Sequence, residues 1–157
     1  MRFVSVSTFF FALIFVTQAH AQERQWGLDT VNNQVFLVFG VPESDDVGLS
    51  FWCDVGKSKV SAFLPETVAP LRRGEHTNIM MDVDGQAERL SATVSRDDGS
   101  GKLTVETTFG LKGSMMKALR EGQSLAITVK GHVNSFPIAD ADFDGLVDAC
   151  NGIDPTG

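Results

Sequence analysis

The sequence contains no tyrosine, and it lacks the short motifs that mark the commonest catalytic sites. It has no Gly-x-Ser-x-Gly nucleophile elbow, no His-Glu-x-x-His zinc helix and no glycine-rich phosphate loop. A glycosidase-like pair of carboxylates stays open among its 20 acidic residues, but nothing in the pattern selects one pair. We therefore expect that the protein is not an enzyme. An uncharacterised hydrolase ranks only third among the functions that the sequence allows, behind a binding or accessory protein and a calcium-binding protein.

Basic residues are also few. The chain has 13 Lys and Arg against 20 Asp and Glu, a net charge of −7. Nucleic acids and anionic membranes need a basic face that displaces their counterions. The charge balance therefore argues against a nucleic-acid partner. It leaves an unknown protein or a small ligand as the expected partner.

Only one apolar run is long, and it stands at the N-terminus. Arg2 precedes an apolar core over residues 9–16, and Ala19 and Ala21 supply the small residues that signal peptidase accepts. A core of about eight residues is too short to cross a membrane, which needs ~20. We expect residues 1–21 to be a cleavable signal peptide and the mature protein, residues 22–157, to be periplasmic or secreted. No later segment predicts membrane insertion.

Cysteine is scarce as well, because the chain contains only Cys53 and Cys150. In an oxidising compartment an even pair usually forms a disulfide. A metal site would need further ligands, but neither His76 nor His132 has ligand spacing to a cysteine. There is no Cys-x-x-Cys redox motif either. The sequence therefore predicts a structural Cys53–Cys150 bridge.

The mature chain shows short stretches of alternating apolar and polar residues, separated by turn signals such as Asp84-Gly85. Residues 34–39 are apolar on both faces, which predicts a strand covered on both sides. We expect a single, mainly β domain (α+β), antiparallel and sandwich-like or barrel-like, with about eight strands and two short helices. The predicted strands are residues 26–30, 34–39, 47–53, 59–64, 77–83, 86–95, 102–109 and 125–130.

Two helices are predicted late in the chain. We expect Ser114 to cap the first and Gly122 to end it in a left-handed conformation. We expect Asp140 to cap the second. An apolar stripe on this second helix would face the sheet and carry Cys150 to Cys53; it consists of Phe143, Leu146, Val147 and Cys150.

The sharpest local motif is a run of alternating aspartates. Asp140, Asp142, Asp144 and Asp148, with Gly145 at the sixth position, have the spacing of a calcium loop. This run resembles the calcium repeats of thrombospondin type-3 and dockerin modules. The resemblance implies that these four carboxylates bind calcium. The alternative is that these negatively charged side chains stand at the N-terminus of the helix that follows, where they interact favourably with the positive end of its dipole.

Three further residues could contact a partner. Trp52 opposes the core face of its predicted strand, so it is either a second-layer packing residue or an exposed anchor. Arg72 and Arg73 lie in the longest irregular stretch and could grip a carboxylate or phosphate, although a solvated pair is commoner. We treat Trp52, Arg72 and Arg73 as a candidate partner surface.

The order of features along the domain resembles a known layout. The features are a tryptophan soon after the export signal, a strand ending in Cys53, the segment Phe136-Pro137-Ile138 and a short helix ending in Cys150. Together they resemble small exported proteobacterial proteins of unknown function, and their layout is also similar to that of the VasI family associated with type VI secretion. The resemblance implies a periplasmic, non-enzymatic role. We expect an exported binding or accessory protein, with an extracytoplasmic calcium-binding protein as the alternative.

Overall fold

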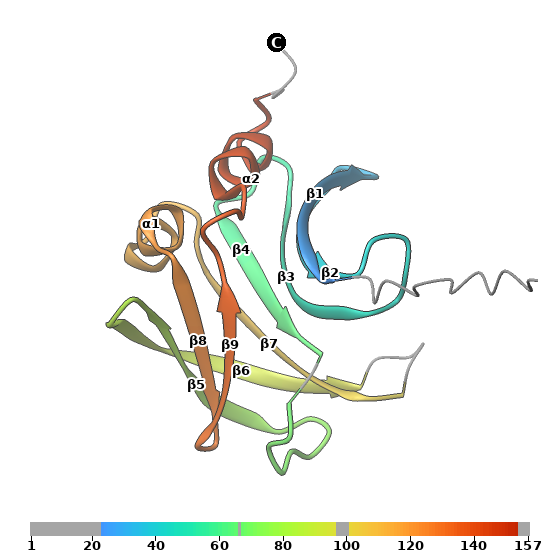
Figure 1. Cartoon of the computed structure of the whole chain (residues 1–157), viewed down its shortest axis with the longest axis vertical. Coiled ribbons are helices and arrows are strands. Elements are labelled where there is room, and N and C mark those ends of the chain that lie inside the picture. Colours follow the sequence, from blue (N-terminus) through green and yellow to red (C-terminus); the bar gives the residue numbers. More distant parts are fainter. Residues whose placement is uncertain (1–22, 66, 97–100, 154–157) are drawn as a thin grey trace, which may run out of the picture.

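The computed structural model describes residues 23–65, 67–96 and 101–153. The predicted signal peptide lies outside the described residues. The described residues form one curled antiparallel sheet with two short helices (Figure 1), as predicted for a single, mainly β domain. The elements are β1 (Gln25–Val31), β2 (Gln34–Gly40), β3 (Val47–Asp54), β4 (Lys59–Leu64), β5 (His76–Val83), β6 (Gln86–Arg96), β7 (Leu103–Gly110), α1 (Ser114–Glu121), β8 (Ser124–Val129), β9 (His132–Pro137) and α2 (Phe143–Cys150).

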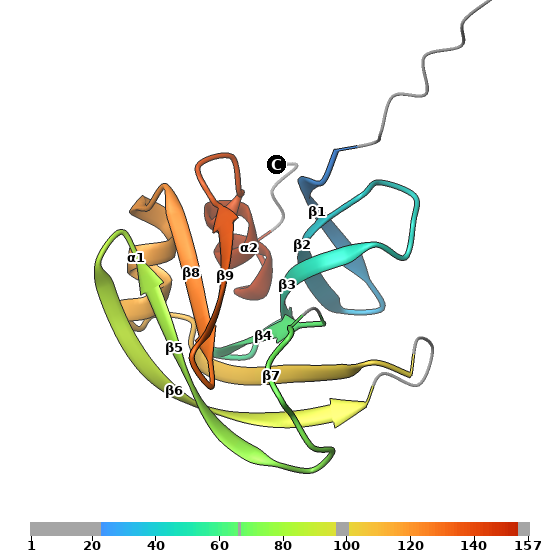
Figure 2. The ribbon, with the colours of Figure 1, turned by 60° about the horizontal axis from the view of Figure 1, so that its bottom comes forward.

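The sheet has the strand order β1-β2-β3-β4-β7-β6-β5-β8-β9. Its strong twist bends it into a half-barrel, which Figure 2 shows from the end opposite α2. Asn32 and Asn33 between β1 and β2, and Asp84 and Gly85 between β5 and β6, all have positive φ. These two turns therefore have the backbone twist that tight hairpins need.

The ninth strand was not predicted from the sequence. β9 follows β8 through Lys130 and Gly131, which have φ angles of 47° and 83°. Lys130 occupies the turn position where Asn or Asp is usual, so the turn signal is weak. Only Phe136 of β9 is buried, so the strand also lacks the apolar alternation that identified the others.

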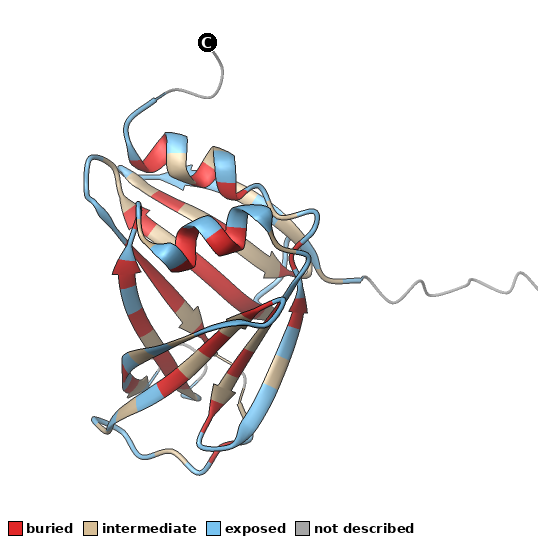
Figure 3. Cartoon of the chain, turned by 90° about the vertical axis from the view of Figure 1, so that its left-hand side faces the viewer, coloured by how far each residue is buried: buried red, intermediate tan, exposed pale blue. Residues whose placement is uncertain are grey.

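Buried residues alternate with exposed and half-buried ones along the strands and recur along both helices (Figure 3). The prediction that residues 34–39 are covered on both sides is wrong. Val35 and Leu37 point inward and are buried, whereas Phe36 on the convex face is only partly buried. The rings of Phe36 and Trp52 stack with centroids 6.4 Å apart. Cross-strand ring packing thus shields an outer face that has no second layer.

Helix α1 packs Met115, Met116, Ala118 and Leu119 against the sheet. Its predicted ends were wrong. Gly113 is at the N-cap without a side-chain bond, and Ser114 donates instead to Glu88 Oε2 at 2.8 Å. Gly122 is extended, with φ of −88°, rather than left-handed. A glycine is needed there for a different reason, because an added Cβ would lie 2.3 Å from Val83 Cγ1.

Helix α2 covers one end of the half-barrel (Figure 1). Asp142, and not Asp140, is its N-cap and accepts from the Gly145 backbone N–H at 2.8 Å. Phe143, Leu146 and Cys150 are buried as predicted, and Val147 is half-buried. The predicted disulfide is confirmed: Cys150 is bonded to Cys53 on β3, with the two Cα atoms 6.0 Å apart.

Candidate functional site

The two ends of the half-barrel differ. The helices occupy one end, and the loop between β4 and β5 crosses the other (Figures 1 and 2). At this second end lies a solvent-open pocket of about 730 Å³. That size is within the ~300–1,000 Å³ of small-molecule sites. We call it the mouth pocket; it is lined by Pro65, Thr67, Val68, Ala69, Pro70, Leu71, Lys102, Leu103 and Asn134.

The loop that forms one wall of the mouth pocket is anchored at its C-terminal half. Lys130 Nζ donates to the Pro70 carbonyl at 2.9 Å and pairs with Glu75 Oε1 at 2.5 Å. Hydrogen bonding from Lys130 lowers the pKa of the Glu75 carboxyl, against an opposing effect of desolvation. Gly74 N–H donates to Val94 O and Val94 N–H donates to Glu75 O, both at 2.8 Å, which fixes the loop to β6.

The part of the loop over the pocket is tied less firmly. Thr67 Oγ1 accepts from the Ala69 N–H at 3.2 Å. Ala69 is buried and Leu71 packs against the core, but Val68 is 84% exposed. The loop thus combines a fixed base with an apolar rim.

Asn134 forms part of the opposite wall. It lies opposite Ile127 in the β8–β9 register, in phase with the buried Phe136, so it faces the concave side. In the part of the chain that the structure describes, its Nδ2 is the only buried side-chain nitrogen or oxygen without a hydrogen-bond partner. An unsatisfied buried donor costs about 1–3 kcal/mol. Such a group in a pocket wall is a candidate ligand contact.

The polar side chains of the described pocket lining are Thr67, Lys102 and Asn134. Each can donate a hydrogen bond, and Lys102 adds a positive charge. No described lining residue is acidic. The arrangement can therefore hold a ligand that combines apolar surface with acceptor oxygens.

The four predicted calcium ligands do not converge. Asp142 caps α2, and Asp144 Oδ1 accepts from Arg120 Nε at 2.5 Å across α1 and α2. Asp140 and Asp148 are exposed. Within residues 23–65, 67–96 and 101–153, no three His, Cys, Asp or Glu side chains are grouped so that they could hold a metal. Calcium binding stays a prediction, and the observed role of Asp142 is the helix cap.

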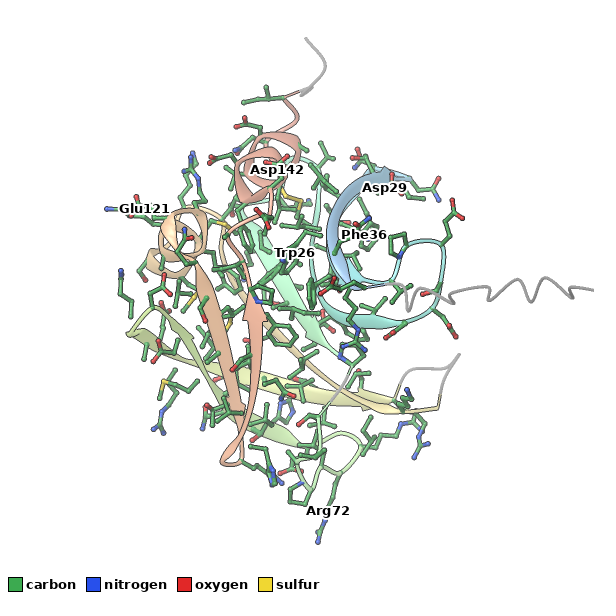
Figure 4. All side chains as sticks on the ribbon, in the orientation of Figure 1. Trp26, Asp29, Phe36, Arg72, Glu121 and Asp142 are labelled. Atoms are coloured by element: carbon green, nitrogen blue, oxygen red, sulfur yellow. A yellow bond between two sulfur atoms is a disulfide. The ribbon has the colours of Figure 1, made fainter. Side chains whose placement is uncertain are left out.

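The predicted partner surface is also divided. Trp52 stacks on Phe36 on the convex face of β2 and β3. Arg72 lies at the lower end of the molecule (Figure 4), in the loop between β4 and β5, which we call the mouth loop. Trp52 instead borders a smaller pocket of about 290 Å³ with Asp54, Lys57 and Lys59. Arg72 and Arg73 are exposed and stand beside the mouth pocket in the chain rather than in its lining.

Sequence reasoning missed the residues that build the mouth pocket. The longest irregular stretch contains its loop, but the residue types there single out only Arg72 and Arg73. Asn134 becomes visible only once β9 is recognised, because its phase with Phe136 then marks it as an inward polar residue. A polar residue on the inner face of a strand was the available signal.

Comparisons with family models, with curated proteins and with solved structures gave no match. Of the helices that the structure describes, neither is long and apolar enough to cross a membrane.

Proposed function

We propose that this protein is an exported, non-enzymatic binding protein that holds a small ligand in the mouth pocket outside the cytoplasm. The observation that carries the proposal is the buried Asn134 Nδ2 group, which has no hydrogen-bond partner and belongs to a residue that lines a pocket of about 730 Å³. A native fold keeps few such groups, so a donor without an acceptor beside a pocket supports a ligand there.

Two other observations support the proposal. The Cys53–Cys150 disulfide is of the kind that persists in oxidising compartments. The site also lies at the end of a rigid sheet beside a loop, where binding residues are commonly found. The helix-covered end is filled by the rings of Trp26, Phe51 and Phe143, whose centroids are 5.1–6.2 Å apart.

Native mass spectrometry tests this function on protein purified from the periplasm. We expect a small molecule to remain bound to wild type and to be lost from Leu103→Trp, which fills the pocket from its half-buried wall. The matched control is Val31→Trp, an exposed site on β1 outside the lining. A ligand retained equally by both variants would place binding elsewhere and overturn the proposal.

A further inference from the structure

The free edge of the sheet beside the mouth pocket indicates what kind of ligand the pocket receives. Resting on the proposed function, we infer that the ligand is a short extended peptide, which pairs with β9 as an added strand and places one apolar side chain in the mouth pocket. Three features support this ligand: the direction of the backbone groups of β9, the lack of charge on that strand and the position of the pocket.

The backbone groups of every second residue of β9 point away from β8. Ile138 N–H donates to Gln123 O at 3.0 Å, at the end of the β8–β9 ladder. Hydrogen-bonded and non-hydrogen-bonded pairs alternate along an antiparallel ladder. Asn134 therefore bonds to β8, whereas Val133 and Ser135 direct their N–H and C=O groups to the other side. β9 is the last strand of the described sheet, so no strand of the sheet pairs with that side.

Pro137 sets the end of this free edge. It has no N–H, and its carbonyl already accepts from Trp26 Nε1 at 2.7 Å. Before Pro137, Val133 is 61% exposed and Ser135 is also exposed. An added strand can therefore exchange four backbone hydrogen bonds with Val133 and Ser135, which limits the paired segment to about five residues.

The two edges of the sheet differ in their protection against a further strand. On β1, Asp29 Oδ1 accepts from the Thr30 backbone N–H at 2.8 Å, so a carboxylate covers that part of the edge. Charged side chains on an edge strand discourage strand addition. β9, from His132 to Pro137, contains no Asp, Glu, Lys or Arg. β9 is therefore the edge that is open to a further strand.

The mouth pocket lies on the concave side of the β9 edge. Asn134 lines this pocket, and residues directly opposite each other in an antiparallel pair point to the same face. The peptide residue opposite Asn134 therefore directs its side chain into the pocket. Six of the nine lining residues are apolar, and Leu71 and Leu103 are half-buried against the core. An apolar side chain placed there is removed from water.

A second copy of this chain fits the same edge less well than a peptide. Two β9 strands could pair about a two-fold axis. The second strand would then bring one of its own inward residues to the position opposite Asn134. These residues are His132 and Asn134, which are polar, and Phe136, which is already buried in its own domain. A free peptide has no such restriction, so its side chain can match the apolar lining.

Water-exchange NMR on mature protein (residues 22–157) tests the strand addition. The probe is the peptide acetyl-Ser-Thr-Leu-Thr-Ser-amide, whose central leucine is its one apolar side chain. When the peptide occupies about nine-tenths of the protein, we expect the exchange of the Val133 and Ser135 N–H groups to slow about tenfold. Leu28 on the other edge of the sheet is the internal control, and its rate should stay the same.

Variants of the peptide separate the backbone from the side chain. Methylation of both threonine nitrogens removes the donors that face β9 and should weaken binding at least about tenfold. Methylation of the leucine nitrogen, which points away from β9, is the matched control and should have little effect. Replacing the leucine by glycine should also weaken binding about tenfold. That difference should disappear in Leu103→Trp, where the pocket is filled.

Variants of the protein place the contact on β9. Val133→Pro removes a donor from the free side and leaves the β8–β9 ladder intact, since the Val133 N–H takes no part in it. We expect the peptide to bind at least about tenfold more weakly. Val133→Ala keeps the N–H and is the matched control. Ser135→Pro repeats the test at the second position, and thermal denaturation verifies that each variant is folded.

The outcomes separate the two proposals. Unchanged exchange at Val133 and Ser135, or equal binding of the differently methylated peptides, would overturn the added strand. A dimer of wild type that is lost in Val133→Pro but kept in Val133→Ala would assign the edge to a second copy instead. A co-purified ligand that is lost in Leu103→Trp but is not a peptide would overturn the ligand class and leave the mouth pocket standing. Retention of that ligand by Leu103→Trp overturns the mouth pocket itself.

Discussion

Trp26 Nε1 donates a 2.7 Å hydrogen bond to the carbonyl of Pro137, which joins the first strand of the sheet to the last across 111 positions of sequence. β1 and β9 are the two edges of the sheet and are not paired with each other. The Trp26 ring also packs on Phe39, with centroids 5.2 Å apart, and lies below α2 in Figure 4. One side chain thus bridges the opening of the half-barrel.

Replacing Trp26 separates the hydrogen bond from the packing. Trp26→Phe removes the donor but keeps a ring, and we expect a loss of about 1 kcal/mol in the free energy of unfolding. Trp26→Ala also leaves a cavity among three phenylalanines, with an expected loss of about 3–5 kcal/mol. Urea denaturation measures both, with the exposed Val31→Ala as control. Equal losses for Phe and Ala would show that packing contributes little.

The disulfide should dominate the stability of the fold. Cys53 and Cys150 are 97 positions apart, and closing a loop of that size stabilises by on the order of 4–5 kcal/mol in the chain-entropy model. We expect the Cys53→Ala, Cys150→Ala double variant to lose most of that amount in guanidinium denaturation. Intact mass after alkylation without reductant is the accompanying check, because two added alkyl groups on wild type would refute the bridge.

Glu75 should make the anchoring of the mouth loop depend on pH. Lys130 lowers the pKa of Glu75 below its usual 4.5, so the unfolded chain takes up this proton at a higher pH than the folded one. The stabilisation is therefore complete above about pH 5.5 and is lost as pH falls through the lowered pKa. We expect the stability difference between wild type and Glu75→Gln to shrink as the pH falls from about 5.5 through the lowered pKa of Glu75. A difference that is constant from pH 7 to 3 would contradict the pairing with Lys130.

Asp142 should act as a helix cap that tolerates its amide. Asp142→Ala removes the acceptor for the Gly145 N–H and should cost about 1 kcal/mol, whereas Asp142→Asn should cost much less because asparagine caps equally well. Thermal denaturation compares the two. Asp140→Ala is the control, since Asp140 does not cap α2.

Calcium provides a separate test of the same segment. Because Asp142 and Asp144 are engaged with Gly145 and Arg120, we expect no heat and no rise in the melting temperature at millimolar calcium. A saturable heat that disappears in Asp140→Asn and Asp148→Asn would instead establish the calcium-binding alternative. These two carboxylates have no part in the cap, so their replacement leaves the helix start intact.

The strands could be predicted wherever local chemistry decides the structure. Asp84-Gly85 supplies the positive φ of its turn, and alternation then fixes which residues of β5 and β6 face inward. The pairing of Cys53 with Cys150 could be predicted because the chain has no other cysteine. The turn is thus decided by neighbouring residues, and the disulfide by the single cysteine pair that the sequence allows.

The rest depends on contacts between distant segments. Ser114 is a good cap by type, yet Glu88 on β6 takes its hydroxyl. Gly122 is needed because Val83 approaches it, which no local pattern reveals. The mouth pocket joins the ends of β4, β7 and β9, so its lining appears only when the sheet order is known.

The long disulfide divides the described chain in a further way. The covalent ring from Cys53 to Cys150 contains every residue that lines the mouth pocket, while β1, β2 and most of β3 lie outside it. A mechanical pull on the two ends would therefore peel away those first strands and stop at Cys53. The strands that line the mouth pocket would carry no tension, because the disulfide bond transmits the force directly from Cys53 to Cys150.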